Sequence, residues 1–195
     1  MRAACGRGLA LLGHERAHLA LAELLMDPER VAREGAVSAL SWLATPEAEL
    51  LLHMKVLAGD TEPLVLGECF RALMTSWPAD AFERVASYLH HADPDVVEQA
   101  ALALGESKHE LTFSRLVGAY EHALSDVKRA LLLPIALVRN EEAFAFVLGV
   151  LESGPESAAL AALTALELFE GEASRAARVR NTATVRGGKI GRAYE

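Results

Sequence analysis

Cysteines are scarce in this chain, and so are aromatic residues and long apolar segments. Cys5 and Cys69 are its only cysteines, too few for a disulfide framework and wrongly spaced for a zinc site, which favours a reducing compartment. The longest apolar run, residues 130–138, has nine residues and includes Pro134, whereas crossing a bilayer takes ~18 or more. Arg2 is not followed by the apolar stretch of a secretory signal. We therefore expect a cytoplasmic protein that contacts no membrane.

The composition favours helices over sheets. Aromatic residues make up only 6% of the chain and hydrophobic residues 52%, with Ala and Leu the most prominent. This balance is typical of helices that pack through small and medium side chains. The predicted fold class is all-α, with a sizeable buried core.

The net charge of −8 is unevenly distributed. Residues 1–172 carry 13 basic and 26 acidic side chains, a balance of −13, whereas residues 173–195 carry six and one, a balance of +5. Because an acidic surface repels a phosphate backbone, the charge of the body disfavours nucleic acid as the main partner.

Two independent registers indicate an internal repeat of about 31 residues. The dipeptide Ala-Leu recurs with its leucines 29, 33, 31, 33 and 29 residues apart, from Leu11 to Leu166. Between these marks, an amphipathic stripe that begins at Phe82 returns 31 residues later at Phe113 and again at Phe144. Extending the stripe backwards in steps of 32 predicts two more core-facing sets, which are Leu50, His53, Met54 and Leu57, and His18, Leu21, Ala22 and Leu25.

Turn signals divide each repeat into two antiparallel helices. Asp, Ser, Gly and Pro precede each Ala-Leu helix, for example at Asp27-Pro28 and Asp93-Pro94, where Asp can cap free N–H groups and Pro suits the first turn. The predicted first helices span about 14–26, 46–58, 78–92, 109–123 and 140–152. The predicted second helices span about 2–12, 28–43, 62–76, 94–107, 126–138 and 155–169.

Residues 93–105, DPDVVEQAALALG, resemble the bacterial type of HEAT-like repeat. The resemblance implies an α-solenoid of stacked hairpins over residues 1–169, with about five repeats and an N-terminal half repeat. Residues 170–195 are then expected to form a cap helix and a basic flexible tail. The incomplete first repeat predicts that the apolar face of Leu9, Leu11 and Leu12, with part of Leu21 and Leu25, is covered by a second copy, a partner protein or further residues.

Several polar groups could carry chemistry. His14, Glu15 and His18 match H-E-x-x-H, in which two histidines hold zinc and the glutamate acts as general base. Arg16 stands where zincins resemble one another in having an apolar residue, no third ligand follows at a recognisable spacing, and the expectation is that no metal binds. The His-Glu pairs at 14–15 and 109–110 are similar to the iron-binding pairs of HEAT-like deoxyhypusine hydroxylase, but they open the other helix of the repeat.

The remaining candidates have structural interpretations. His53 is expected to be a hydrogen-bonded, half-buried histidine, and Cys5 and Cys69 small core residues. The pair His90-His91 is expected at a solvated helix end, because adjacent histidines on a helix point about 100° apart. Trp42 and Trp77 resemble the caging aromatics of HEAT-like alkylpurine DNA glycosylases, although packing between repeats is the favoured interpretation. The basic tail is expected to be a solvated cap, with an arm for an acidic partner or a nucleic-acid contact as alternatives.

The sequence thus predicts a non-catalytic protein-interaction module or scaffold without a cofactor. The candidate partner-binding residues are Arg33, Trp42, Trp77, Glu98, Lys128, Arg175 and Arg178. An enzyme of the HEAT-like lyase or metal-dependent type is the first alternative, and nucleic-acid binding is the second.

Overall fold

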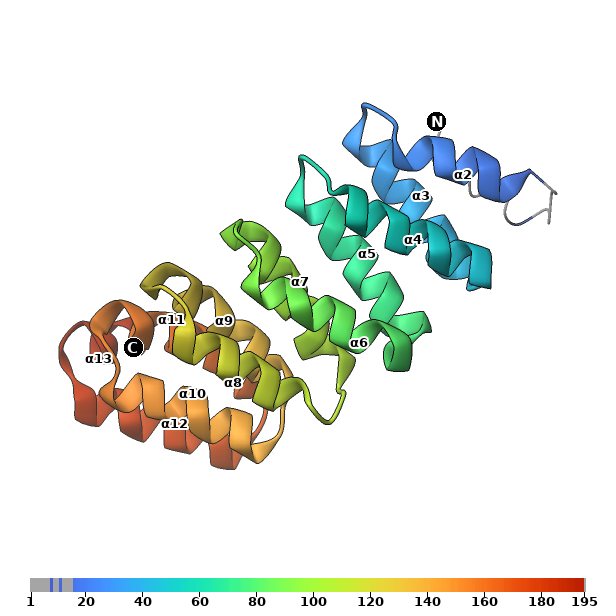
Figure 1. Cartoon of the computed structure of the whole chain (residues 1–195). Helices are drawn as coiled ribbons and strands as arrows, with labels where there is room; N and C mark the ends of the chain where they lie inside the picture. The colour runs from blue at the N-terminus through green and yellow to red at the C-terminus, as the bar shows by residue number, and fades with distance from the viewer. Residues whose placement is uncertain (1–7, 9–10, 12–15, 195) are drawn as a thin grey trace. The chain divides into compact units, whose positions relative to one another are not determined.

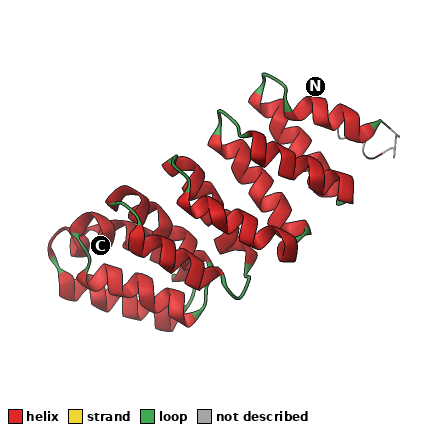
Figure 2. Ribbon diagram, viewed as in Figure 1, coloured by secondary structure: helices red, strands yellow, loops and turns green. Residues whose placement is uncertain are grey.

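The computed structural model describes residue 8, residue 11 and residues 16–194. Within this part of the chain every regular element is a helix and there is no strand (Figure 2). The prediction of an all-α protein is confirmed. The expected helix at 2–12 lies almost wholly outside the described residues.

The helices follow one another with short connections, close to the predicted boundaries. The first helices of the hairpins are α2 (Ala17–Leu25), α4 (Pro46–Ala58), α6 (Pro78–Ser87), α8 (Thr112–His122) and α10 (Glu141–Ser153). The second helices are α3 (Arg30–Leu43), α5 (Pro63–Ser76), α7 (Pro94–Ser107), α9 (Ser125–Leu137) and α11 (Glu156–Leu166). Short 3-10 turns, η1 (Tyr88–His90) and η2 (Glu167–Phe169), follow α6 and α11. The last elements are α12 (Ala173–Arg186) and α13 (Gly188–Tyr194), so a helix occupies the segment that was expected to be a flexible tail.

The chain forms two compact units, Met1–Ala103 and Leu104–Glu195. The boundary falls inside α7, which Figure 1 shows as one continuous helix. In the first unit α2 packs on α3, α3 packs on α5, and α4 packs on both α3 and α5. Large apolar side chains, among them Leu21, Leu40, Leu52, Phe70 and Phe82, are fully buried in this unit.

Three equivalent turns open the second helices of the first unit. In each, an aspartate accepts a hydrogen bond of 2.9 Å from the backbone N–H two residues later, and the aspartates are Asp27, Asp60 and Asp93. Such a turn bends the chain into the next helix and satisfies a free N–H. The predicted start signals at these three positions are confirmed.

Asp60 is also the centre of a buried ionic network. One carboxylate oxygen is 2.7 Å from both Arg33 Nε and Lys55 Nζ, and the other accepts from Arg33 Nη2 at 2.8 Å. The Arg33 guanidinium also donates to the carbonyls of Asp27 and Pro28. Because Arg33 comes from α3 and Lys55 from α4, the network ties two successive hairpins together. Desolvation alone would raise the pKa of Asp60, but the hydrogen bonds from Arg33 and Lys55 outweigh it and lower that pKa.

The apolar stripes predicted from the period of 31 are confirmed on α6 and wrong on α4. Phe82, Val85, Ala86 and Leu89 are all buried. On α4, however, Leu50, Met54 and Leu57 are exposed, Leu57 by 81%, and the buried face carries Ala48, Leu52, His53, Lys55 and Val56. The ion pair of Lys55 with Asp60 holds this other face inward. Leu21 and Leu25, which were expected to lie partly on the apolar end face of the first hairpin, are buried, whereas Leu11 is 65% exposed.

In the second unit, α9 packs on α8, α10 and α11, and the C-terminal helices α12 and α13 pack on α10 and α11. Phe144 and Phe169 meet edge to face, with ring centroids 5.1 Å apart. Val179 and Ala183 of α12 and Ile190 of α13 are buried, which anchors the C-terminal segment. Its basic side chains contact the same unit. Lys189, for example, pairs with Glu156 at 2.7 Å, and Arg186 donates to the carbonyls of Leu151 and Gly154.

Candidate functional site

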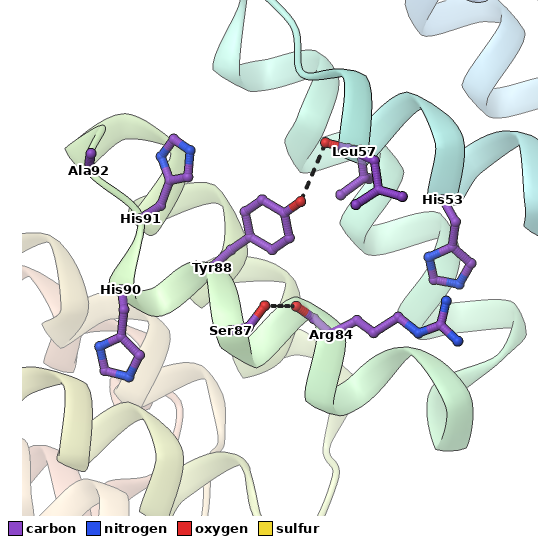
Figure 3. A pocket seen from close by; sticks show the side chains of 9 residues that line it. His53, Leu57, Arg84, Ser87, Tyr88, His90, His91 and Ala92 are labelled. Atoms are coloured by element: carbon purple, nitrogen blue, oxygen red, sulfur yellow. Dashed lines mark hydrogen bonds between the residues drawn. The ribbon is translucent and has the colours of Figure 1, made fainter.

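A pocket of about 510 Å³ lies in the first unit beside α4 and α6 (Figure 3). α4 contributes His53, Val56 and Leu57 to its walls. The end of α6, η1 and the following loop contribute the rest, which are Arg84, Ser87, Tyr88, His90, His91 and Ala92.

Tyr88 connects the two sides of this pocket. Its ring packs on Phe70 with centroids 5.0 Å apart, and its hydroxyl donates a weak hydrogen bond of 3.4 Å to the carbonyl of Val56. Burial raises the pKa of Tyr88, so the hydroxyl keeps its proton at neutral pH. The Tyr88 side chain is therefore a fixed, uncharged part of the pocket wall.

His91 is held in a defined orientation by two contacts. Its ring stacks on Tyr88, with centroids 5.9 Å apart and 23° between the planes. Its Nδ1 accepts a hydrogen bond of 3.1 Å from the backbone N–H of Asp93. A neutral imidazole that accepts at Nδ1 carries its proton on Nε2, so His91 offers an Nε2–H donor.

His53 is buried in the pocket wall with little hydrogen bonding. The residue is 9% exposed, and its Nε2 makes no hydrogen bond. Glu49 Oε1 lies 3.5 Å from this nitrogen. Desolvation, with a further contribution from the positive charge of Arg84, lowers the pKa of His53. The half-buried, hydrogen-bonded histidine expected here is thus more deeply buried, and its Nε2 lacks the expected hydrogen bond.

Arg84 supplies the permanent charge of the pocket. Figure 3 shows its side chain extended toward His53, with the guanidinium beside the imidazole. Within the described residues this guanidinium forms no ion pair and no hydrogen bond. The pocket lining contains one arginine and three histidines but no carboxylate, although the chain as a whole carries a net charge of −8. The arrangement can accept an anionic group next to apolar surface.

A second, shallower groove of about 370 Å³ lies along α3 and α5. Its residues are Val37, Ser38, Ser41, Trp42, Glu68, Arg71, Ala72 and Thr75. Trp42 is 63% exposed at this groove. The interpretation of Trp42 as packing between repeats is therefore wrong, because the indole lies at the end of α3 on the solvent side. Trp77, which separates α5 from α6, is half-buried.

The other candidate partner residues lie in different parts of the two units. Arg33 is only 7% exposed and fully engaged with Asp60, so it is a structural residue and does not reach a partner. Glu98 and Lys128 are half-buried, and the Lys128 ammonium lies 5.4 Å from the centre of the Tyr120 ring. Arg175 and Arg178 both pair with Glu141.

Of the three residues suspected of holding a metal, the structure describes only His18. His14 and Glu15 lie outside the described residues. His18 Nε2 is 2.9 Å from Thr45 Oγ1 and so has a hydrogen-bonding partner. Among residues 16–194, no group of three or more His, Cys, Asp or Glu side chains could hold a metal ion. Cys69 is buried, which raises the pKa of its thiol to about 12 and makes it inert; Cys5 is not among the described residues.

The sequence identified His53 and His90-His91 separately but did not predict that they share a pocket. Arg84 and Tyr88 were missed because no local motif marks them. The relevant signal is that Tyr88 and His91 are three residues apart, at the start of η1 and directly after its end, a spacing that places side chains close together in a 3-10 turn.

The fold and the pocket define an all-α protein of helical hairpins with a basic, partly apolar cavity. No protein-family model matches the sequence, and no curated protein does either. Within the described part of the chain, no helix is long and apolar enough to cross a membrane.

Proposed function

We propose that this protein is a non-catalytic protein-binding module of the cytoplasm, built from HEAT-like hairpin repeats that stack as an α-solenoid. The repeated aspartate turns at Asp27, Asp60 and Asp93 support the repeat, because the same hydrogen bond recurs every 33 residues. The packing of α3 on α5 supports stacking in the first unit, because these are the second helices of successive hairpins. Stacked repeats present extended surfaces that commonly bind other proteins.

The observation that carries the binding function is the exposure of Trp42 at the groove along α3 and α5. An exposed indole adds nothing to the core, and tryptophan is among the residue types most enriched at the energetic centres of protein interfaces. The Arg71–Glu68 pair flanks the indole with polar groups. An aromatic anchor with a polar surround is the usual anatomy of an interface.

Affinity capture from the source cell, quantified for the wild type and for Trp42→Ala, tests this proposal. We expect the Trp42→Ala variant to lose the proteins that the wild type captures, at unchanged melting temperature. Leu124→Ala is the matched control, because Leu124 is also highly exposed but lies in the second unit; it should capture the same proteins as the wild type. Equal capture by Trp42→Ala would overturn the proposed surface, and stoichiometric zinc or iron in the purified protein would overturn the non-catalytic assignment.

A further inference from the structure

The basic pocket adjoins a row of exposed apolar side chains on α4. The row consists of Leu50, Met54 and Leu57, which are four and three residues apart and so share one face of the helix. Leu57 belongs to both features, because it also lines the pocket. The seven residue steps from Leu50 to Leu57 cover roughly 10 Å of helix at 1.5 Å per residue. An apolar surface and a cationic cavity are thus continuous on one side of the first unit.

The cationic end of this surface has groups that can bind an anion. The Arg84 guanidinium has no internal partner in the described structure, and the His91 ring is fixed with an Nε2–H donor available. His53 beside Arg84 is neutral, so Arg84 is the one fixed charge in the pocket lining. Glu49 and Asp80 are the carboxylates that act on His53, and neither lines the pocket. A guanidinium with free N–H groups binds a carboxylate through two parallel hydrogen bonds.

The apolar row indicates which chemical groups the ligand carries besides its negative charge. Single exposed apolar residues are ordinary on a protein surface, but three on one helical face beside a cavity form a patch. Their contact with another molecule would bury Leu57, Met54 and Leu50, the side chains that α4 does not use in its own core. The ligand therefore needs apolar groups at a distance of one to two helical turns from its negative charge.

We propose that this side of the first unit binds an acidic, apolar segment of a partner protein, with a carboxylate at Arg84 and apolar side chains over Leu57 and Met54. The inference rests on the proposed protein-binding function and adds the chemistry of the partner. Charge complementarity favours a peptide over a nucleic acid, because only one fixed positive charge lines the pocket and the chain is acidic overall.

Two short probes isolate the role of the carboxylate. The acidic probe is acetyl-Leu-Ala-Leu-Glu-Asp amide, and the control probe replaces its last two residues with Gln and Asn. Titration of the isotopically labelled full chain is followed by NMR at the Arg84 Nε–H and at the imidazoles of His53 and His91. We expect saturable shifts with the acidic probe and binding at least about tenfold weaker with the control, because a charge-assisted hydrogen bond is roughly twice as strong as a neutral one.

Three variants complete the test. Arg84→Gln and Leu57→Glu should each weaken binding of the acidic probe at least about tenfold, since one removes the charge that pairs with the carboxylate and the other repels it. Arg180→Gln is the control, because Arg180 is an exposed arginine of α12 in the second unit, and it should bind like the wild type. Equal binding of both probes, or an unchanged affinity in Arg84→Gln, would overturn the inference.

Two further outcomes separate this inference from the proposed function. Inorganic phosphate that shifts the same resonances at lower concentration than the acidic probe would show a site for small phosphate anions and overturn the peptide assignment. If the acidic probe does not bind but partner capture still depends on Trp42, the proposal of an acidic partner segment is wrong. The proposed protein-binding function would then still stand.

Discussion

Asp60 is a stability determinant of the first unit, because it neutralises two buried cations. Its side chain is 2% exposed, and those of Arg33 and Lys55 are 9% and 4% exposed. We predict that Asp60→Ala lowers the free energy of unfolding by about 3 kcal/mol, since removal of one member of a buried ionic group leaves the others uncompensated. Urea denaturation followed by circular dichroism measures the change. Asp126→Ala, which removes an exposed carboxylate paired with Arg129, should change it by less than about 1 kcal/mol.

His53 gives the protein a pH dependence of known sign. Because burial lowers its pKa in the folded state, the unfolded chain binds a proton more readily than the folded chain. The contribution of His53 to stability is therefore complete above its ordinary pKa of about 6.5 and is lost as the pH falls through the lowered, folded-state pKa. Denaturation at several pH values should show the wild type losing more stability than His53→Gln below pH ~6.5. Parallel pH profiles would contradict the prediction.

Single residues also show which features could be predicted from the sequence and which could not. The aspartates at 27, 60 and 93 were recognised because their hydrogen bonds join neighbours in the chain. Arg33 was taken for a partner-binding residue because its true partner, Asp60, lies 27 positions away. The exposure of Trp42 could not be predicted either, since it depends on where α3 ends relative to α5.

At the scale of helices, boundaries could be predicted far better than orientations. Residues 46–58 were predicted as a helix and form α4 with the same boundaries, because Thr45 caps it and Pro46 begins it. The face of α4 was predicted wrongly because Leu50, Leu51 and Leu52 are consecutive, so apolar residues surround the helix. The ion pair of Lys55 with Asp60 places Lys55 on the buried face of α4, and this contact accounts for the orientation of the helix. The pocket beside α4 follows from that orientation and could not be predicted from the sequence.

A close backbone contact at Gly105, in the part of α7 that belongs to the second unit, gives a prediction about a glycine. A Cβ at Gly105 would collide with the carbonyl oxygen of Pro134 and press on Leu137. We predict that Gly105→Ala lowers the free energy of unfolding by about 2 kcal/mol, because overpacking forces neighbouring groups apart. Gly118→Ala is the matched control: Gly118 lies within α8 with open space around its Cα, so alanine there should stabilise the protein by about 0.5–1 kcal/mol. Similar losses in both variants would rule out the packing explanation.

At the scale of the whole molecule, the sequence predicted a periodic all-α chain, because the apolar pattern and the turn signals share one period. The division into Met1–Ala103 and Leu104–Glu195 was not predicted, because α7 continues the pattern without a break across the boundary. A close contact such as that of Gly105 with Pro134 cannot be recognised from the spacing of apolar residues in the sequence.

The two units should unfold as separable cooperative blocks. Trp42 and Trp77 are the only tryptophans and both belong to the first unit, so fluorescence reports that unit, whereas far-UV circular dichroism reports helices of both. We predict that Asp60→Ala moves the fluorescence midpoint to lower urea, while Gly105→Ala moves part of the circular dichroism transition and leaves the fluorescence midpoint nearly unchanged. Stability is not uniform across a structure, and separate compact units can open independently. If both variants shift both signals equally, the chain unfolds in one cooperative step, and the division into two units has no energetic counterpart.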